Sequence, residues 1–198
     1  MKAKRLWWLV RLCMTQSSEG RAAYARKAGI FAGVGQNVGI SPRHVPLYSE
    51  LIRFHNNIRV ARGVEFVTHD TLHRVFNQSP EVREMLGDDE IRFHEHIGCI
   101  EIMDNVFLGA KTIVLDSVRI GPNVIVASGS VVVKDLEPNG IYAGVPAKRI
   151  GSFDELVRKR AIQEKNGSSA TTQHNQKLTP QEIDAAWRIF EEQHATSQ

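Results

Sequence analysis

Cysteine is scarce in this chain, and long apolar segments are absent. Among 198 residues only Cys13 and Cys99 are cysteines, and two cysteines cannot by themselves form a disulfide framework or a zinc site. No stretch approaches the roughly 20 consecutive apolar residues that span a membrane. These absences lead us to expect a cytoplasmic protein with reduced cysteines and no membrane span.

An excess of charge of one sign is also absent. The formal net charge is +3, aromatic residues make up 7% of the chain, and no basic run is interleaved with aromatic residues. A nucleic-acid-binding surface usually has such a run, so we expect no nucleic-acid partner. The hydrophobic content of 42% is ordinary for a globular protein. The length is sufficient for one domain with a substantial core and some appended segments.

Residues 101–136 repeat with a period of six. Every sixth residue from Ile102 onward is aliphatic, and the residue four places after each of these is mostly small or β-branched. The aliphatic set is Ile102, Leu108, Val114, Ile120, Val126 and Val132, and the second set is Val106, Thr112, Val118, Val124, Ser130 and Leu136. This period is neither the 3.6 of an α-helix nor the simple alternation of an ordinary strand.

A period of six predicts a parallel β-helix. One short strand and one turn occupy each repeat, the β-branched residues point inward at alternate places, and Asn, Asp, Gly and Pro supply the turns. Three repeats close one coil, and stacked coils bury a continuous aliphatic column. The predicted fold class is therefore an all-β solenoid.

The first 29 residues are predicted to form a helical segment before the solenoid. Residues 1–14 are basic at their start and apolar afterwards, but the apolar run is too short for a signal peptide. We expect an amphipathic helix there, which packs on protein or lies on a membrane surface. Ser18 is the expected cap of a second helix that ends at Gly29.

The solenoid itself is predicted over residues 30–150, with an insertion. A weaker copy of the repeat occupies residues 30–66, and its phase breaks near Pro42 and Pro46. Residues 67–98 show no repeat and are too long for a turn, so we expect an inserted loop with a functional role. The repeat resumes from Ile100, and residues 140–149 are expected to leave the solenoid.

Residues 151–198 are predicted to form C-terminal helices joined by a polar linker. Residues 153–163 are predicted to form a helix. Residues 164–176, which are rich in Ser, Thr, Asn and Gln, are predicted to form a flexible linker. Thr179 and Glu182 fit a capping box with Pro180 at the first helical position. The helix that follows, to about residue 193, carries Trp187 and other apolar residues on one face.

Four motifs make the chain resemble the hexapeptide-repeat acyltransferases, in particular the sugar and polysaccharide O-acetyltransferases. They are VEFVTHD at residues 64–70, the hexapeptides of residues 102–136, SGSVVVKD at residues 128–135 and AGVPAK at residues 143–148. The resemblance covers roughly residues 28–160. It implies a left-handed coil, which the spacing alone would not show, because right-handed crossovers are the general rule.

The resemblance also implies function. Members of this family are mostly trimers whose active site lies between neighbouring subunits, and they use acetyl-CoA without a metal ion in the chemistry. The expected function is therefore transfer of an acetyl group from acetyl-CoA to a hydroxyl or amine of a sugar-like acceptor, in surface polysaccharide synthesis. Streptogramin-type antibiotics are an alternative acceptor class, because relatives of this fold modify them.

By resemblance, His69 matches the family's catalytic histidine. Acetyl transfer needs a base that takes the proton of the acceptor, and histidine suits that role near neutral pH. His69 follows a predicted strand and opens the long loop, so its side chain can face a cleft. Asp70 either orients the imidazole or caps the turn. Adjacent residues of an extended segment point in opposite directions, which disfavours direct contact between the two.

Ala110, Ser128 and Gly129 are the expected pantetheine-binding corner. Ala110 and Ser128 are 18 residues apart, which is one complete coil, so they should stack at the roughly 4.7–4.9 Å spacing of paired strands. Small side chains on one corner leave backbone groups open to a long, thin, amide-bearing ligand. The matching positions line the acetyl-CoA site in the family, although corners also need small residues for packing alone.

Lys134, Lys148 and Arg149 are the expected partners of the CoA phosphates. Phosphates require cations, and both lysines match basic positions near CoA in the family, whereas Arg149 is included as their neighbour. Val133 is a departure, because the family often has Thr there, and a hydroxyl contact with CoA is then missing.

Two other classes of function stay open at this point. Solenoids of this shape also serve as metal-dependent carbonic anhydrases, which hold a metal ion with three imidazoles. The candidates here are His55, His69, His73, His94 and His96, but most lie in the irregular loop, and a solvated loop is the simpler reading of the last two. A non-catalytic solenoid that binds partners is the second alternative.

Overall fold

The structure is a computed structural model of the chain, and it describes residues 2–88, 90–167, 170, 172 and 177–195. It divides into two compact units, residues 1–153 and residues 154–198.

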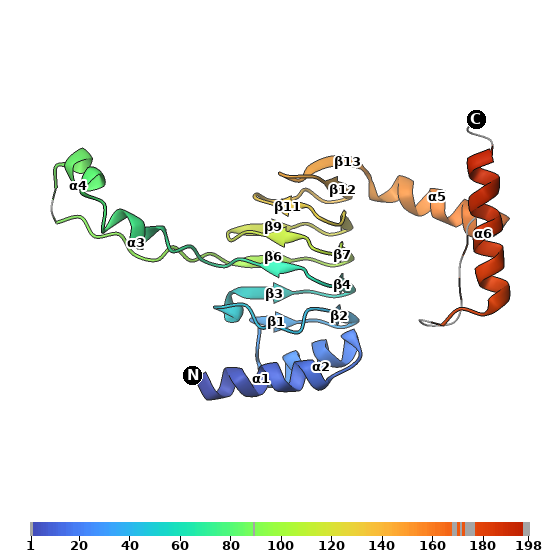
Figure 1. Cartoon of the computed structure of the whole chain (residues 1–198), viewed down its shortest axis with the longest axis horizontal. Helices are drawn as coiled ribbons and strands as arrows, with labels where there is room; N and C mark the ends of the chain where they lie inside the picture. The colour runs from blue at the N-terminus through green and yellow to red at the C-terminus, as the bar shows by residue number, and fades with distance from the viewer. Residues whose placement is uncertain (1, 89, 168–169, 171, 173–176, 196–198) are drawn as a thin grey trace. The chain divides into compact units, whose positions relative to one another are not determined.

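Three sheets surround one core in the first unit (Figure 1). The first sheet consists of β1 (Gly33–Val34), β3 (Ile52–Phe54), β6 (Ile100–Ile102) and β9 (Val118–Ile120). The second consists of β2 (Val38–Ile40), β4 (Ile58–Val60), β7 (Val106–Leu108), β10 (Val124–Val126), β12 (Gly140–Ala143) and β13 (Lys148–Ser152). The third consists of β5 (Glu65–Phe66), β8 (Ile113–Val114) and β11 (Val131–Val132). All pairs are parallel except β12 with β13.

The chain visits the three sheets in turn, and three hexapeptides make one circuit. Ile100 pairs with Val118 in the first sheet, Val106 with Val124 in the second and Ile113 with Val131 in the third. Each pair is separated by 18 residues, the spacing predicted from the repeat.

The predicted inward positions form the core. All six residues of the aliphatic set are fully buried, and the second set is at most 3% exposed. Thr112 and Ser130 belong to this second set, and both hydroxyls donate to the backbone carbonyl of Ala127 or Gly109. Buried hydroxyl groups need such partners, so these two polar residues are compatible with the aliphatic column.

One corner of the coils, between the first and second sheets, is closed by a ladder of asparagines. Each side-chain amide donates to the next side-chain oxygen along the ladder, at 2.7–2.8 Å. The members are Asn37, Asn57, Asn105, Asn123 and Asn139, and all have positive φ angles, between 52° and 60°. Asparagine tolerates this left-handed conformation better than most residues. We call this edge of the solenoid the asparagine corner.

Two helices precede the sheets, as predicted. They are α1 (Lys2–Met14) and α2 (Ser18–Ala28), and α2 ends at Gly29 in the left-handed conformation. The predicted cap at Ser18 is wrong by one position. Ser17 is the cap, because it has extended backbone angles and its hydroxyl accepts a backbone N–H of the first turn.

Helix α1 has two apolar faces. Leu12 is buried in a small cluster with Ala25, Ile30 and Val45. The other face is exposed, and its residues are Leu6, Trp7, Val10 and Met14. Among the residues that the structure describes, no helix has the length and apolar character needed to cross a membrane.

The insertion leaves the solenoid after β5 and returns before β6 (Figure 1). It contains two short helices that the sequence analysis did not predict, α3 (Leu72–Phe76) and α4 (Pro80–Leu86). The rings of Phe76 and Phe93, 5.1 Å apart, join its outgoing and returning arms. In the irregular segment between Ile40 and Ile52, the structure has only the short 3₁₀ helix η1 (Ser49–Leu51).

The expectation that residues 140–149 leave the solenoid is wrong for the first part of that segment. Strand β12 continues the second sheet, because Val124 pairs in parallel with Gly140. The chain then turns through a cis Val145–Pro146 bond and returns as β13, antiparallel to β12. The loss of hexapeptide phase after Leu136 hid this additional strand.

The remaining helices are α5 (Phe153–Asn166) and α6 (Pro180–Ala195). The predicted capping box of α6 is present, since Glu182 donates its N–H to the Thr179 hydroxyl and its carboxylate accepts the Thr179 N–H. The predicted linker begins inside α5, and most of its other residues lie outside the described part of the chain.

Candidate active site

The predicted pantetheine-binding residues meet on one corner of the solenoid. Ala110 follows β7, Ser128 and Gly129 follow β10, and the N–H of Gly129 donates to the carbonyl of Ala110 at 2.8 Å. Ser128 and Gly129 are exposed. A Cβ atom on Gly109 would lie 2.4 Å from the backbone nitrogen of Ser128, so glycine permits this close approach of two coils. The corner between the second and third sheets therefore presents small residues and accessible backbone.

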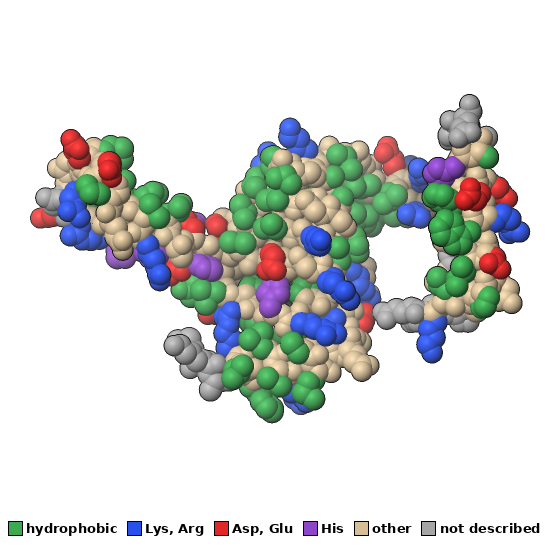
Figure 2. Space-filling model, in the orientation of Figure 1, with side chains coloured by type: hydrophobic (Ala, Val, Ile, Leu, Met, Phe, Trp, Pro, Cys, Tyr) green, Lys and Arg blue, Asp and Glu red, His purple; other side chains and the backbone are tan. Residues whose placement is uncertain are grey.

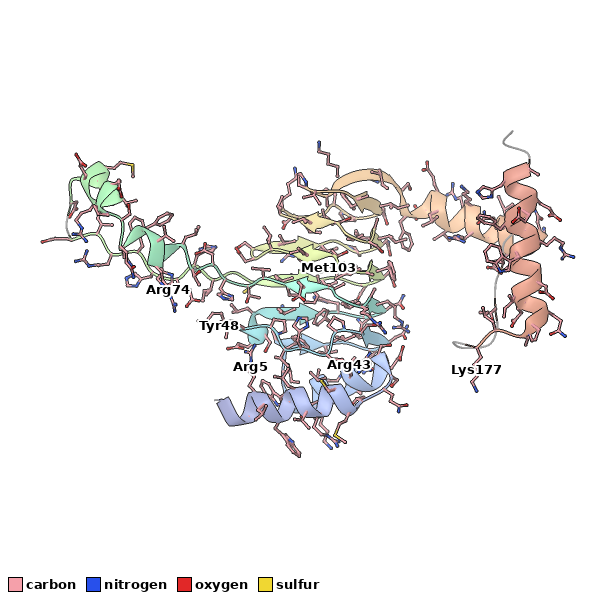
Figure 3. The ribbon with its side chains drawn as sticks, in the orientation of Figure 1. Arg5, Arg43, Tyr48, Arg74, Met103 and Lys177 are labelled. Carbon is pink, nitrogen blue, oxygen red and sulfur yellow. The ribbon has the colours of Figure 1, made fainter. Side chains whose placement is uncertain are left out.

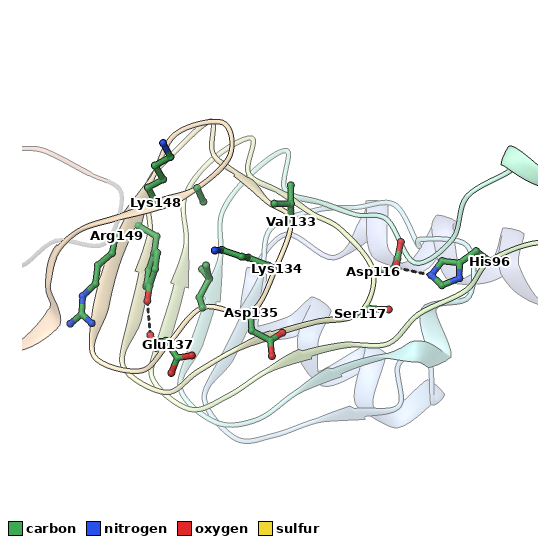
Figure 4. Close-up of a pocket in the computed structure, with 12 residues that line it drawn as sticks. His96, Asp116, Ser117, Val133, Lys134, Asp135, Glu137, Lys148 and Arg149 are labelled. Atoms are coloured by element: carbon green, nitrogen blue, oxygen red, sulfur yellow. Dashed lines mark hydrogen bonds and ion pairs between the residues drawn. The ribbon is translucent and has the colours of Figure 1, made fainter.

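The three predicted phosphate partners gather in one pocket of about 950 Å³ (Figure 4). Lys134, Lys148 and Arg149 line it, and all three are exposed. Val133 forms part of its wall. The Arg149 guanidinium also donates to the carbonyl of Asn139 at 2.9 Å, which restrains it. Three cations along one pocket suit a ligand with several phosphates, and Asp135 and Glu137 line the pocket beside them.

A histidine and a carboxylate occupy the opposite end of the same pocket (Figure 4). His96 Nε2 lies 3.1 Å from Asp116 Oδ1. From the sequence, His96 is expected to be a solvated loop residue, and Asp116 is not among the predicted site residues. The alternation of histidines at positions 94 and 96 was the available signal, but nothing in the sequence connected either one with a turn 20 residues later. We call the edge between the third and first sheets, which holds Asp116 and Lys134, the pocket corner.

His69 lies at the base of the insertion. It forms an isolated antiparallel bridge with Ile97. Its ring meets the ring of Tyr48 edge-on, with 5.4 Å between centroids and an interplanar angle of 89°. Its Nδ1 atom is buried and has no hydrogen-bond partner among the described residues, so Nε2 is the ring atom with better access to a ligand.

The base of the insertion is a two-stranded ribbon with two different faces. Successive residues of extended chain point to opposite sides, and His69 pairs with Ile97. His69 and Glu95 therefore share one face, where both contact Tyr48. His96 lies on the other face, toward Asp116 and the pocket. Within one chain, the structure does not bring His69 into the pocket with the three cations.

Asp70 does not contact the His69 ring through any hydrogen bond in the described part of the chain. Its carboxylate accepts the backbone N–H of Leu72 at 3.0 Å. This is a local turn contact at the start of α3, as such residues often make.

The described His, Cys, Asp and Glu residues form no group of three or more that could hold a metal ion. The two histidines that precede the insertion, His44 and His55, each pair with one carboxylate. His55 lies 3.0 Å from Glu101, and His44 lies 3.0 Å from Glu65.

Glu101 is the centre of a charged cluster on the outer face of the first sheet, where Figure 2 shows acidic, basic and histidine side chains side by side. Its carboxylate accepts hydrogen bonds from His55, Arg119 and Arg53 at 2.8–3.2 Å. The bond from His55, and then those from Arg119 and Arg53, lower the pKa of Glu101 to about 2, although partial burial acts in the opposite direction. The cluster joins three neighbouring strands and lies outside the pocket lining.

Comparison with known proteins agrees with the repeat. Residues 100–134 match the bacterial transferase hexapeptide family, described as six repeats. A 2,3,4,5-tetrahydropyridine-2,6-dicarboxylate N-acetyltransferase from Clostridium perfringens is 45% identical over 62 residues, which is 31% of this chain and 26% of that protein. The chain thus matches about a quarter of the length of such curated relatives.

Solved structures share the fold at low sequence identity. A maltose O-acetyltransferase from Clostridium difficile has a TM-score of 0.53 and 22% identity, over 76% of this chain and 87% of that one. A hexapeptide-repeat acetyltransferase from Vibrio cholerae, solved with acetyl-coenzyme A, has a TM-score of 0.51 and 19% identity, over 76% and 86%. The predicted resemblance to the hexapeptide-repeat acyltransferases is therefore confirmed, by the family match of residues 100–134 and by the shared fold.

Proposed function

We propose that the protein is an acetyl-CoA-dependent acetyltransferase that acts on a hydroxyl or amine of a sugar-like acceptor. The observation that carries this proposal is the pocket of about 950 Å³, in which Lys134, Lys148 and Arg149 meet. A second support is that the proteins which share its repeat or its fold are acetyltransferases.

The proposed reaction needs no reactant other than acetyl-CoA and the acceptor. The oxygen or nitrogen of the acceptor attacks the thioester carbonyl of acetyl-CoA, and the imidazole of His69 takes the acceptor's proton. The tetrahedral intermediate then collapses, the carbon–sulfur bond breaks, and the CoA thiolate receives the proton. The products are the acetylated acceptor and free CoA. Asp70, which in this proposal keeps a supporting role, would hold the start of the insertion.

Acetyl-CoA would extend from the pocket to the small-residue corner. Its phosphates would bind Lys134, Lys148 and Arg149, since ammonium and guanidinium groups form strong charge-assisted bonds with phosphate. Its pantetheine arm would pass Ala110, Ser128 and Gly129, where exposed backbone and small side chains leave room. Lys134 follows the third sheet's β11, whereas Ala110 precedes β8 and Ser128 precedes β11, and these strands have only two residues each.

The proposal includes a left-handed coil and a homotrimer. Within one chain His69 does not line the pocket that holds the three cations, so in this proposal a neighbouring copy brings His69 to the bound acetyl-CoA. A site between subunits meets that need. The domain division into residues 1–29, 30–150 and 151–198 and the cytoplasmic location belong to the same proposal.

The acceptor is proposed to be a sugar, as part of surface polysaccharide synthesis. A hydroxyl acceptor is the first candidate, because the chain shares its fold with a maltose O-acetyltransferase, although the sequence identity is only 22%. An amine acceptor is the second candidate, favoured by 45% identity to an N-acetyltransferase across 62 residues. Streptogramin-type antibiotics remain the third class to test.

Residues 1–14 are proposed to make a weak contact with a membrane surface. The exposed apolar face of α1 includes Leu6, Trp7 and Val10, and Lys4 and Arg11 are exposed on the same helix. Apolar and basic residues together suit an anionic lipid surface. Flotation of the protein with anionic vesicles, compared with the variant Trp7→Ser, would measure this contact.

The test of the proposed function is CoA thiol release from acetyl-CoA in the presence of candidate acceptors. The panel contains sugars, nucleotide sugars, streptogramins and a 2,6-dicarboxylate imine. We expect acceptor-dependent release that falls by about 10²–10⁴-fold in His69→Ala. His94→Ala is the matched control, because His94 is an exposed histidine of the same insertion, and it should keep wild-type activity.

Two outcomes would overturn the proposal. One is the absence of acetyl-CoA binding in calorimetry, which would favour the non-catalytic solenoid. The other is a stoichiometric metal ion whose removal abolishes a hydratase activity, which would favour the carbonic-anhydrase-like enzyme.

A further inference from the structure

Three chain segments meet around His69. The Thr68 hydroxyl, in a fully buried side chain, donates to the carbonyl of Leu47 at 2.7 Å. The Gly98 N–H donates to the carbonyl of Thr68 at 2.9 Å, and the Asp70 N–H donates to the carbonyl of His96 at 3.1 Å. The residues on both sides of His69 are thus tied to the segment before β3 and to the returning arm of the insertion.

Tyr48 completes this enclosure in an unusual backbone conformation. Its φ and ψ angles are 52° and 42°, in the left-handed region, which is disfavoured for a bulky side chain and persists only where surrounding contacts impose it. Figure 3 shows Tyr48 at the side of the solenoid from which the insertion leaves. Its phenol donates to Glu95 Oε2 at 2.9 Å, and its ring lies edge-on against His69.

The edge-on ring contact with Tyr48 orients the plane of the His69 ring. Nδ1 of His69 is buried without a hydrogen-bond partner in the described part of the chain, so no carboxylate or carbonyl orients the ring there. An imidazole that rotates about its side-chain bonds would present Nε2 in several directions. A wall at 5.4 Å, perpendicular to the ring, restricts that rotation.

We propose that Tyr48, held in place by Glu95, is a positioning residue for His69. This inference rests on the proposed function, because it assigns Tyr48 and Glu95 a role in the same acetyl transfer. Neither residue exchanges a proton with the substrate. The phenol donates to Glu95 Oε2, and this hydrogen bond raises the pKa of Tyr48.

Four variants separate the ring contact from the hydrogen bond that holds it. Tyr48→Leu removes both, and we expect kcat to fall by about 100-fold, since a displacement of about 1 Å at a catalytic group can have that effect. Tyr48→Phe and Glu95→Ala keep the aromatic ring but lose the hydrogen bond between residues 48 and 95, so kcat should fall by about 3–10-fold. Glu95→Gln keeps an acceptor for the phenol and should restore most of the activity. The KM for acetyl-CoA should not change in any of them.

A matched control and a spectroscopic readout accompany the kinetics. Tyr24→Leu removes another partly buried tyrosine, in α2, and should leave kcat unchanged. The proton resonances of the His69 ring, identified by their loss in His69→Gln, should shift in Tyr48→Leu because the ring current of Tyr48 is removed. They should not shift in Tyr24→Leu.

The outcomes are distinguishable from a failure of the proposed function. A folded Tyr48→Leu variant with wild-type kcat and unshifted His69 resonances would overturn the inference while leaving acetyl transfer intact. If Tyr48→Leu does not fold, wild-type kcat in both Tyr48→Phe and Glu95→Ala would overturn it equally. If the wild-type protein releases no thiol with any acceptor, the proposed function fails, and the resonance shift alone still tests the contact between Tyr48 and His69.

Discussion

Two corners of the same coils are built in opposite ways. At the asparagine corner, the side-chain amide of each turn asparagine donates a hydrogen bond to the asparagine of the next coil, so the ladder runs through successive coils. At the pocket corner, Lys134 is exposed and lines a cavity, and Asp116 bonds to His96 of the insertion. Positive φ angles occur at both corners, for example at Asn105 and Ser117. Similar backbone turns therefore carry a hydrogen-bonded ladder at one edge and line a pocket at the other.

This contrast explains why a regular repeat can carry a pocket on one corner without losing its core. The buried column fixes the backbone of every coil, whatever residue occupies the outward corner positions. A corner whose side chains do not bond to each other can change in sequence without disturbing the stack. Substitutions should then affect stability at the asparagine corner and ligand binding at the pocket corner.

The largest expected effect is loss of stability in Asn105→Ala. Asn105 accepts a hydrogen bond from Asn57 and donates one to Asn123, and its φ is 60°. Alanine loses both bonds and disfavours this conformation, so the free energy of unfolding should fall by about 2–3 kcal/mol. Urea denaturation followed by circular dichroism measures it.

Two controls decide whether the ladder is responsible. Asn105→Gly restores the backbone freedom without the bonds and should lose only about 1–2 kcal/mol. Ser117→Ala changes a residue of similar conformation at the pocket corner, and its effect should stay within about 0.5 kcal/mol. Equal losses in Asn105→Ala and Ser117→Ala would show that the two corners do not differ in this way.

The charged cluster on the first sheet should make stability depend on pH in the acidic range. The pKa of Glu101, about 2, lies below the ordinary value of 4.5. Its contacts therefore stabilise the fold fully above pH 4.5, and this contribution disappears as the pH falls from 4.5 towards 2. Because the partners Arg53 and Arg119 are themselves well exposed, we expect a contribution of about 1–2 kcal/mol rather than more.

Thermal unfolding of Glu101→Gln against pH measures this effect. The variant should be less stable than wild type at pH 6, and the difference should vanish near pH 2. Glu65→Gln is the control, because Glu65 also points outward from a strand but pairs with one imidazole only. An identical pH dependence in wild type and Glu101→Gln would contradict the assignment.

The coiled part of the fold could be predicted because its core repeats. Ile102, Leu108 and the residues in phase with them all face one buried column, and an aliphatic residue therefore recurs at every sixth position of the sequence. The ladder was not predicted, because an asparagine in a turn has many possible partners and only the register of the coils selects the next asparagine. Strand β12 was not predicted because its residues are out of phase with the six-residue repeat.

The candidate site was only partly predictable. Ala110 and Ser128 were expected to stack because one coil separates them, and the structure brings them together. The pairing of His96 with Asp116, and of Tyr48 with Glu95, depends on where the insertion returns to the solenoid. No periodicity governs a return of this kind, so contacts over 20 and 47 residues need the folded chain.

Removal of the pocket cations should weaken acetyl-CoA binding without changing stability. The double variant Lys134→Ala with Lys148→Ala loses two charge-assisted contacts, and we expect the Kd to rise by about 10-fold, or roughly 1.4 kcal/mol. Calorimetric titration measures it, and the loss should shrink at high salt. Lys27→Ala, at an exposed position of α2, should leave the Kd unchanged. An equal Kd in all three proteins would remove the pocket from the CoA site.

The smallest expected effect is a gain. Val133 is 46% exposed and lines the pocket, at a position where the related acyltransferases often have Thr. Val133→Thr keeps the shape of the side chain and adds one hydroxyl at the pocket wall. If acetyl-CoA binds there, the hydroxyl should lower the Kd by about 2–5-fold, as one added hydrogen bond of 0.5–1 kcal/mol would.

The matched change at the third sheet is Val131→Thr, where the half-buried side chain does not line the pocket. It should leave the Kd unchanged and lower the free energy of unfolding by up to about 1 kcal/mol, since a hydroxyl there loses part of its hydration. A gain at position 133 without a loss of stability would show that the pocket corner accepts new polar groups. A loss of affinity in Val133→Thr would instead indicate that this wall contacts an apolar part of the ligand, and would place the phosphates nearer to Lys148 and Arg149.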